Sequence, residues 1–120
     1  MINVKPQILE LLQQTGVEVV FSNPQNAETL PVISYFEASN IELARDGFDE
    51  VWTEVIFQID VWAMQPSQCS TIAIQIDDIL RNKGFKRQFS SDLFEQDTLI
   101  HHKTMRYRGV VDNRTYNIYQ

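Results

Sequence analysis

The sequence predicts an α+β fold in which a single antiparallel β-sheet carries two main helices packed on one face. Three observations support this prediction. Residues 51–63 are rich in β-branched and aromatic side chains, and one alternating face of this segment is continuously apolar. Residues 66–84 place apolar side chains at helical spacing. The predicted order is helix, three strands, helix and two or three strands, and such runs of consecutive strands favour an α+β architecture.

The chain has the size and composition of one globular domain, residues 1–120. It is 43% hydrophobic and 22% charged, and a chain of this length supports one ordinary hydrophobic core. Its net charge is −6, which argues against non-specific nucleic-acid binding, because such binding depends on Lys and Arg neutralising phosphates. The N-terminus has no apolar run of the kind found in signal peptides or membrane spans, so we expect a cytoplasmic protein.

The first part of the chain predicts one short helix and two strands. Residues 4–15 have the pattern of an amphipathic helix, with Pro6 suited to its first turn and Gly16 suited to ending it. The apolar run at residues 17–21 predicts a strand. Residues 31–38 predict a second strand, whose first position is a proline that needs no hydrogen-bonded N–H there.

Two polar segments predict connections around these strands. Residues 22–26 (SNPQN) have turn chemistry, and residues 39–50 (SNIELARDGFDE) predict a polar connection with two apolar residues. In the strand that follows, residues 51–63, charged and aromatic side chains alternate on the face opposite the apolar one. That face includes Trp52 and Trp62. These tryptophans either lie under a helix as part of the core or belong to an interface.

The second helix is the best-defined element. Pro66 begins it and Gly84 ends it, and cationic side chains near its C-terminus complement the helix dipole. Its predicted buried stripe comprises Cys69, Ile72, Ala73, Ile76, Ile79 and Leu80. Ile74 lies on the opposite side of the helix, among polar residues.

The remainder of the chain predicts strands and short connections. A strand at residues 85–89 leads into an acidic loop at residues 90–97, and a long strand follows at residues 99–111. Residues 112–113 (Asp-Asn) suit a hairpin turn, and residues 115–119 predict a short final strand.

The sequence contains no recognisable catalytic constellation. It lacks the glycine-rich phosphate-binding motifs and the G-x-S-x-G nucleophile motif. His101 and His102 are adjacent, so on a strand they point to opposite faces of the sheet and cannot readily share one metal ion. Asp77 and Asp78 face away from the apolar stripe and are expected to be solvated. The single cysteine, Cys69, is predicted to be an inert buried thiol, and we expect neither cofactor nor metal.

Several residues instead suggest protein interfaces, which are enriched in aromatic side chains and arginine. The polar segment 39–50 carries exposed apolar residues, and two arginines share one face of the strand at 99–111. The candidate interface residues are Ile41, Arg45, Phe48, Ile74, Arg106 and Arg108.

The order of segments is similar to that of a known family. The strand PVISYFEAS (31–39) precedes the long strand VIFQIDVWA (55–63), a helix ends in LRNKGF (80–85), and a late strand has the sequence IHHKTMRYRG (100–109). This order resembles the tail completion, or tail terminator, proteins of long-tailed bacteriophages, and the similarity covers nearly the whole chain. Its most specific parts are the strand end IDVWA (59–63) and the Gly-Phe pair after the helix.

The resemblance implies a structural phage or prophage protein without enzymatic activity. It implies a hexameric ring that caps the tail tube, contacts tail tube protein on one side and head connector proteins on the other, and surrounds a channel through which DNA passes without tight binding. The protein would belong to the tail and neck of the virion and assemble in the host cytoplasm. Ring closure requires two different patches on each subunit, and the exposed sheet edges and residues 39–50 are the natural candidates.

Two alternatives remain open from the sequence. One is a small α+β ligand-binding domain or enzyme with a pocket between helix and sheet, in which His101 or His102 acts with Asp60. The other is a different head–tail connector component, such as a stopper or adaptor, or a part of a phage-derived contractile device.

Overall fold

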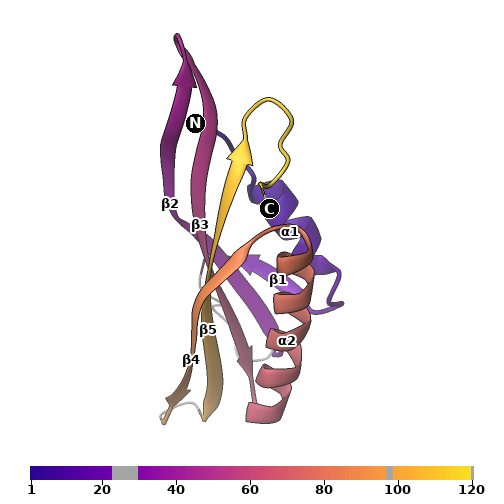
Figure 1. Cartoon of the computed structure of the whole chain (residues 1–120). Coiled ribbons are helices and arrows are strands. Elements are labelled where there is room, and N and C mark those ends of the chain that lie inside the picture. The colour runs from indigo at the N-terminus through magenta and orange to yellow at the C-terminus, as the bar shows by residue number, and fades with distance from the viewer. Residues whose placement is uncertain (23–29, 97–98, 120) are drawn as a thin grey trace.

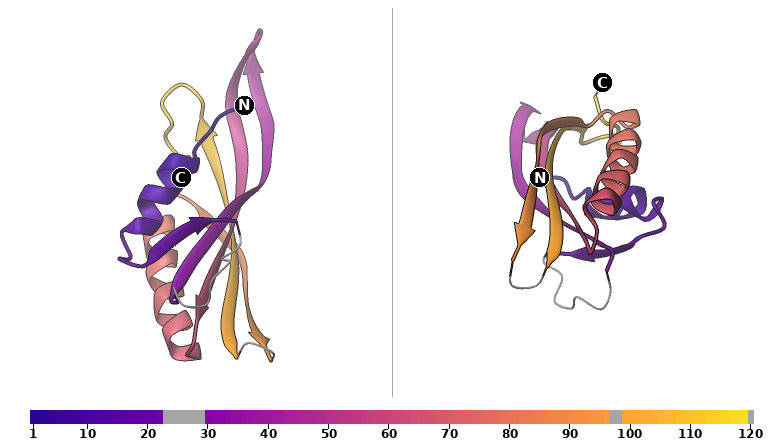
Figure 2. Two further views of the ribbon diagram at one scale, coloured as in Figure 1. Left: turned by 180° about the vertical axis from the view of Figure 1, so that it is seen from behind. Right: turned by 90° about the horizontal axis from the view of Figure 1, so that it is seen from below.

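The protein is described by a computed structural model that covers residues 1–22, 30–96 and 99–119. It forms one five-stranded sheet with two helices (Figure 1). The elements in chain order are α1 (Lys5–Gln13), β1 (Glu18–Phe21), β2 (Val32–Asp46), β3 (Asp49–Ala63), α2 (Pro66–Asn82), β4 (Lys86–Glu95) and β5 (Ile100–Asp112). Both helices lie on the same side of the sheet, as the rear view shows (Figure 2). The predicted α+β class is therefore confirmed.

The sheet order is β1-β2-β3-β5-β4. All neighbouring strands are antiparallel except β1, which pairs in parallel with β2, so the sheet is mixed rather than wholly antiparallel. A parallel pair needs a connection that returns the chain to the same end of the sheet, and residues 22–31 separate these two strands. Most of the turn predicted at residues 22–26 lies outside the described residues.

The hydrophobic core lies between the sheet and the helices. On β3 the predicted apolar face is confirmed, since its side chains are fully buried: Val55, Phe57, Ile59 and Val61. Helix α1 buries Ile8, Leu11 and Leu12. Helix α2 buries most of the predicted stripe, namely Cys69, Ile72, Ala73, Ile76 and Leu80. Because both helices cover one face of the sheet, no helix of the described residues lies over the opposite face.

The predicted polar connection at residues 39–50 is wrong. Strand β2 continues to Asp46, β3 begins at Asp49, and Gly47 and Phe48 form a tight turn between them. Gly47 has a φ of 63°, which glycine adopts without steric cost. Register shifts interrupt the β2–β3 pairing after Glu37, Glu42 and Ala44. Both faces of this hairpin end meet solvent, so its sequence lacks the alternation that identifies a half-buried strand.

Two further segments near the C-terminus differ from expectation. The acidic loop predicted at residues 90–97 is mostly strand, because β4 runs to Glu95 and pairs along its length with β5. Charged side chains are common on such edge strands, where they discourage aggregation. The predicted final strand at residues 115–119 is a turn followed by one isolated bridge between Val111 and Ile118. Among the described residues, no helix is long and apolar enough to cross a membrane.

Candidate assembly surfaces

The end of the β2–β3 hairpin projects beyond the helices and the rest of the sheet (Figure 1). We call residues 41–49 the arm, and every one of them is exposed. The arm lengthens the molecule, whose principal extents are 53 × 24 × 22 Å. Its exposed apolar side chains make the arm a candidate surface for protein contacts.

The arm carries three of the predicted interface residues. The side chain of Ile41 is 48% exposed, and Phe48 at the tip is fully exposed. Arg45 donates hydrogen bonds of 2.7 and 3.0 Å from Nε and Nη2 to the two carboxylate oxygens of Glu42. This ion pair draws the pKa of Arg45 upward, chiefly through the hydrogen bond to Glu42. Leu43, which the sequence reasoning missed, adds a second half-exposed aliphatic side chain.

The base of the arm is anchored by Glu50. Its Oε1 accepts a 2.7 Å hydrogen bond from the N-terminal amine, and its Oε2 contacts Thr53 and Asn113. These contacts, with the hydrogen bond from the amine the largest, lower the pKa of Glu50 below its ordinary value. The arm is therefore fixed where it leaves the body, although its own surface is open to solvent.

The second candidate surface is the sheet face that no helix covers, which we call the bare face. Arg106 and Arg108 lie on it together, as predicted. Arg106 Nη2 donates a 2.8 Å hydrogen bond to Gln58, and Arg108 Nε donates a 2.6 Å hydrogen bond to Glu54. The guanidinium of Arg106 also lies 5.7 Å from the ring centroid of Phe89 on β4. These contacts fix both arginines in place on the face.

The bare face also holds buried polar atoms without partners among the described residues. These are Ser39 Oγ, Thr104 Oγ1 and Arg106 Nε. Buried polar groups in folded proteins nearly always form hydrogen bonds to protein or water, so water or a partner group is expected at each of these three atoms.

The two tryptophans lie away from the helices, so they are not core residues under a helix. Trp62 stacks on His102 with ring centroids 3.7 Å apart and an interplanar angle of 14°, and its Nε1 donates a 2.9 Å hydrogen bond to Ser34. Trp52 meets Tyr119 edge to face at 6.0 Å. Both rings are half-buried by contacts within the chain.

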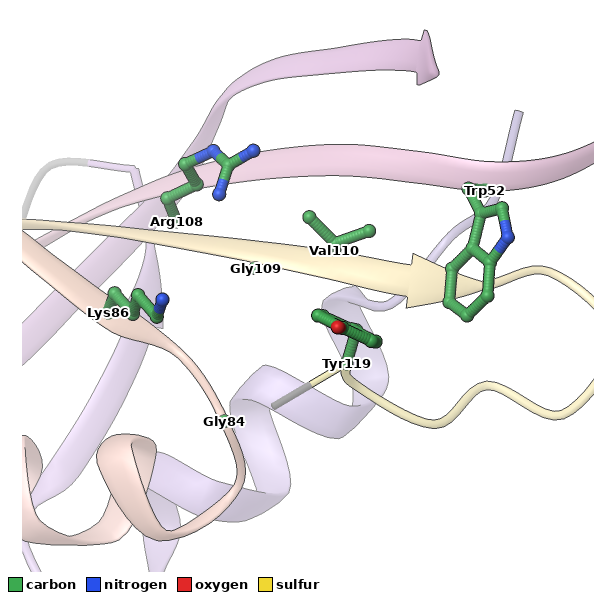
Figure 3. Close-up of a pocket in the computed structure, with 7 residues that line it drawn as sticks. All are labelled: Trp52, Gly84, Lys86, Arg108, Gly109, Val110 and Tyr119. Carbon is green, nitrogen blue, oxygen red and sulfur yellow. The ribbon is translucent and has the colours of Figure 1, made fainter. Parts of the chain in front are cut away.

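A cavity of about 470 Å³ lies beside Trp52, between the beginning of β4 and the C-terminal residue Tyr119 (Figure 3). We call it the β5 pocket. Its lining residues are Trp52, Gly84, Lys86, Arg108, Gly109, Val110 and Tyr119. Most of the accessible lining is apolar, and two cations stand at one end. The sequence did not reveal this pocket, because only Arg108 of its residues was among the predicted set.

The alternative of a ligand-binding domain or enzyme relies on Asp60 acting with His101 or His102, and the structure brings only one of the two histidines to Asp60. His102 Nε2 lies 2.7 Å from Asp60 Oδ1, whereas His101 points to the other face and contacts Phe94. Trp62 covers one side of the His102 ring, and the cavity beside the two histidines is only about 100 Å³. The Asp60–His102 pair therefore resembles a structural contact, with Asp60 only 3% exposed.

The cysteine near this small cavity has the properties of an inert thiol. Cys69 Sγ donates to the backbone carbonyl of His101 at 3.4 Å, and burial raises the pKa of the thiol. A protonated, buried thiol is a poor nucleophile. The described residues contain no group of three or more His, Cys, Asp or Glu side chains placed to hold a metal ion.

The remaining predicted residues differ in outcome. Ile74 is 63% exposed on α2, as its position on the helix predicted, but it is isolated from the arm and from the bare face. Asp78 is exposed, whereas Asp77 is largely covered. Asp77 accepts a hydrogen bond from Tyr107 and lies within 3.5 Å of Arg81 and within 3.3 Å of Arg87. The expectation that Asp77 is solvated is therefore wrong.

The fold and these surfaces define a small one-sheet α+β protein whose exposed apolar and charged side chains gather on a projecting arm and on a bare sheet face. A family model described as tail completion protein gp17 matches residues 4–112. The chain belongs to this family of phage tail completion proteins. The family resemblance predicted from the sequence is thereby confirmed, and the family identifies a structural component of the virion tail. A comparison with curated proteins gives no match.

Proposed function

We propose that the protein forms a hexameric ring that caps the phage tail tube and joins tail to head, and that it acts through its surfaces without catalysis. Residues 1–120 act as one domain in this role, with no cofactor. The observation that carries the proposal is the arm, whose apolar tip and charged sides are exposed and project beyond the body of the molecule. Membership of the tail completion family supports the same role.

A closed ring needs two different, complementary patches on every subunit. The chain offers more than two. The arm presents Ile41, Arg45 and Phe48, and the bare face presents Arg106 and Arg108 next to polar atoms that lack partners among the described residues. The edge strands β1 and β4 have free backbone groups that can pair with a neighbouring chain. Ile74 on α2 is a further, separate contact point.

Stacking in the virion requires contacts above and below the ring. In the proposed arrangement tail tube protein binds one side of the ring and head connector proteins bind the other, and phage DNA passes through the centre. A net charge of −6 suits a conduit, because a subunit with few unpaired cations does not hold DNA phosphates tightly. The ring forms in the host cytoplasm during tail assembly and stays at the neck of the virion.

The experiment that tests this function is a measurement of solution mass by light scattering after size exclusion. The protein is measured over a range of concentrations, alone and mixed with the tail tube protein of the same phage. We expect a species of six subunits, six times the chain mass of 14.0 kDa, either alone or on the tube. A single subunit under both conditions would contradict the proposal.

A further inference from the structure

We infer that the tip of the arm of one subunit inserts into the β5 pocket of the next copy of the chain. Phe48 fills the apolar part of the pocket, and the two aspartates beside it, Asp46 and Asp49, face the pocket cations Lys86 and Arg108. This contact is the one that closes the ring, so the inference rests on the proposed function. It assigns the two complementary patches that a ring requires.

The tip has features that an isolated subunit does not satisfy. Phe48 is fully exposed at the end of a tight turn, where its ring meets only water. Asp46 and Asp49 are direct cross-strand partners, and like charges placed opposite each other on neighbouring strands are destabilising. Arg45 does not relieve this repulsion, because both of its hydrogen bonds go to Glu42. The tip therefore combines an aromatic side chain with two carboxylates that have no cation within ion-pair distance among the described residues.

The β5 pocket has the complementary features. Strand β4 pairs with β5 from Arg108, and the C-terminal segment pairs with β5 from Asp112 to Val110, which leaves the edge of β5 open at Gly109 between them. Gly109 and Val110 form an apolar floor there, and Trp52 closes one end (Figure 3). A volume of about 470 Å³ accommodates a phenylalanine side chain with space to spare.

The charges at the pocket are available to a partner. Lys86 is exposed, and it forms no ion pair within the part of the chain that the structure describes. Arg108 pairs with Glu54 through Nε, which leaves donors on its terminal nitrogens. Two cations beside an apolar hollow match two carboxylates beside a phenyl ring. Such charge complementarity directs partner choice and register more than it adds affinity.

The arm of a subunit cannot reach the pocket of the same subunit. The pocket residue nearest to Phe48 in the chain is Trp52, which lies four residues along β3. At about 3.3 Å per residue this separation is roughly 13 Å, and the paired strands β2 and β3 keep the tip from folding back over it. The occupant must therefore be another copy. A tip that binds a different patch on its neighbour makes a heterologous contact, which propagates until a ring closes.

Disulfide capture tests this contact directly. A chain carrying Asp46→Cys and Tyr119→Cys keeps Phe48 and cannot close a disulfide internally, because the bridge requires Cα atoms within about 7 Å. Under mild oxidation of the assembled protein, we expect a non-reducing ladder that extends beyond the dimer towards six subunits. Each single variant is a matched control, and the native Cys69 is buried and stays out of the reaction. Asp46→Cys alone giving dimers would show that tips meet tips, and would overturn the inference.

A charge exchange gives an independent test. Lys86→Glu should raise the protein concentration at half-assembly about tenfold, and Asp49→Lys should do the same, whereas the double variant should return towards the parent value. If the double variant instead shows the combined loss of assembly of the two single variants, the proposed pairing is wrong.

The two proposals fail in different ways. If six subunits assemble while the double-cysteine chain gives no ladder, the ring stands and the arm–pocket contact is wrong. If the cysteines cross-link only to tail tube protein carrying its own engineered cysteine, the pocket serves another partner and the inference is wrong. If no condition yields an oligomer, both the ring and this contact are wrong.

Discussion

The phenol of Tyr107 donates a 2.7 Å hydrogen bond to Oδ1 of Asp77, and this bond connects the centre of β5 to helix α2. Tyr107 is fully buried at the sheet–helix boundary, and Asp77 also lies near Arg81 and Arg87. The bond thus belongs to the packing of the body and is distant in role from the arm and the bare face. Substitutions of Tyr107 or Asp77 are therefore expected to change the stability of the fold without changing assembly directly.

We expect Tyr107→Phe to lower the free energy of unfolding by about 1–2 kcal/mol, because it removes one hydrogen bond to a charged group while Asp77 keeps its arginine neighbours. Denaturant unfolding followed by circular dichroism measures the change. Tyr116→Phe is the matched control, since the Tyr116 side chain is half-exposed, and it should change stability by less than about 0.5 kcal/mol. Equal stability of both variants would show that the bond contributes nothing.

The same pair predicts a dependence on alkaline pH. Burial, followed by the hydrogen bond to Asp77, raises the pKa of Tyr107 above its ordinary value of 10.0. The folded protein therefore holds this proton more tightly than the unfolded chain. The stabilisation is fully present below pH 10 and is lost as the pH rises further, at up to about 1.4 kcal/mol per pH unit. Tyr107→Phe should flatten this decline, and an unchanged slope would contradict the assignment.

We expect Gly109→Ala to destabilise the fold, because a Cβ at this position would lie 2.6 Å from the ring of Phe85. Phe85 is itself buried, so its ring cannot move away freely. Overpacking of this kind costs about 1–3 kcal/mol. Adding Phe85→Leu makes room for the new Cβ, so the double variant should lose less free energy of unfolding than the two single variants lose together. Thermal unfolding of the four chains gives the coupling, and strict additivity would refute the close contact.

We expect His102→Leu to cost about 3 kcal/mol, because it leaves the buried carboxyl group of Asp60 with only the 3.4 Å hydrogen bond from Gln58 Nε2. Adding Asp60→Asn should recover part of that loss, since a neutral amide is less costly to leave buried than a charge. Urea titrations measure both variants. A His102→Leu chain as stable as the parent would indicate that the pair is kept for a reason other than structure, and would revive the ligand-binding alternative.

Phe48→Asp should leave the free energy of unfolding within about 0.5 kcal/mol of the parent, because the side chain makes no contribution to the core. It should nevertheless abolish ring formation. Met64→Asp is the matched control, as Met64 is also exposed but follows the far end of β3 from the arm. Light scattering compares the two. Normal assembly of Phe48→Asp would remove the arm from the proposed interface.

The sequence predicted the elements that bury one face. The stripe from Cys69 to Leu80 and the alternation from Val55 to Val61 are both visible, because burial against a core imposes a period of 3.6 or 2 on apolar positions. The helix ends were marked by prolines and glycines. These signals also give the α+β class and the bare face of the sheet.

The arm escaped prediction because it has no buried face. Residues 39–46 are a strand only through pairing with β3, and polar residues such as Glu42 occur where both faces meet solvent. The length of strand β4 was underestimated for the same reason, since the sequence predicted that it ends at residue 89 and it continues to Glu95. Its residues 86–94 are exposed on both faces, so no buried face imposes an apolar alternation on them.

The candidate sites were predicted residue by residue but not as surfaces. Ile41 and Phe48 are recognisable as apolar residues in polar surroundings, and they do share the arm. The β5 pocket, in contrast, joins Trp52, Lys86 and Tyr119, which are far apart in the chain. Their proximity follows from strand order and from the C-terminal segment returning to β5, and no local pattern encodes either of these.

The central claim, that a ring of this protein caps the tail tube, is tested most directly by electron microscopy of tail tubes assembled with the purified protein. We expect a sixfold ring with an open channel at one end of each tube, and tubes that stop growing at that end. Copies scattered along the tube wall, or bare ends that continue to elongate in an excess of the protein, would contradict the claim.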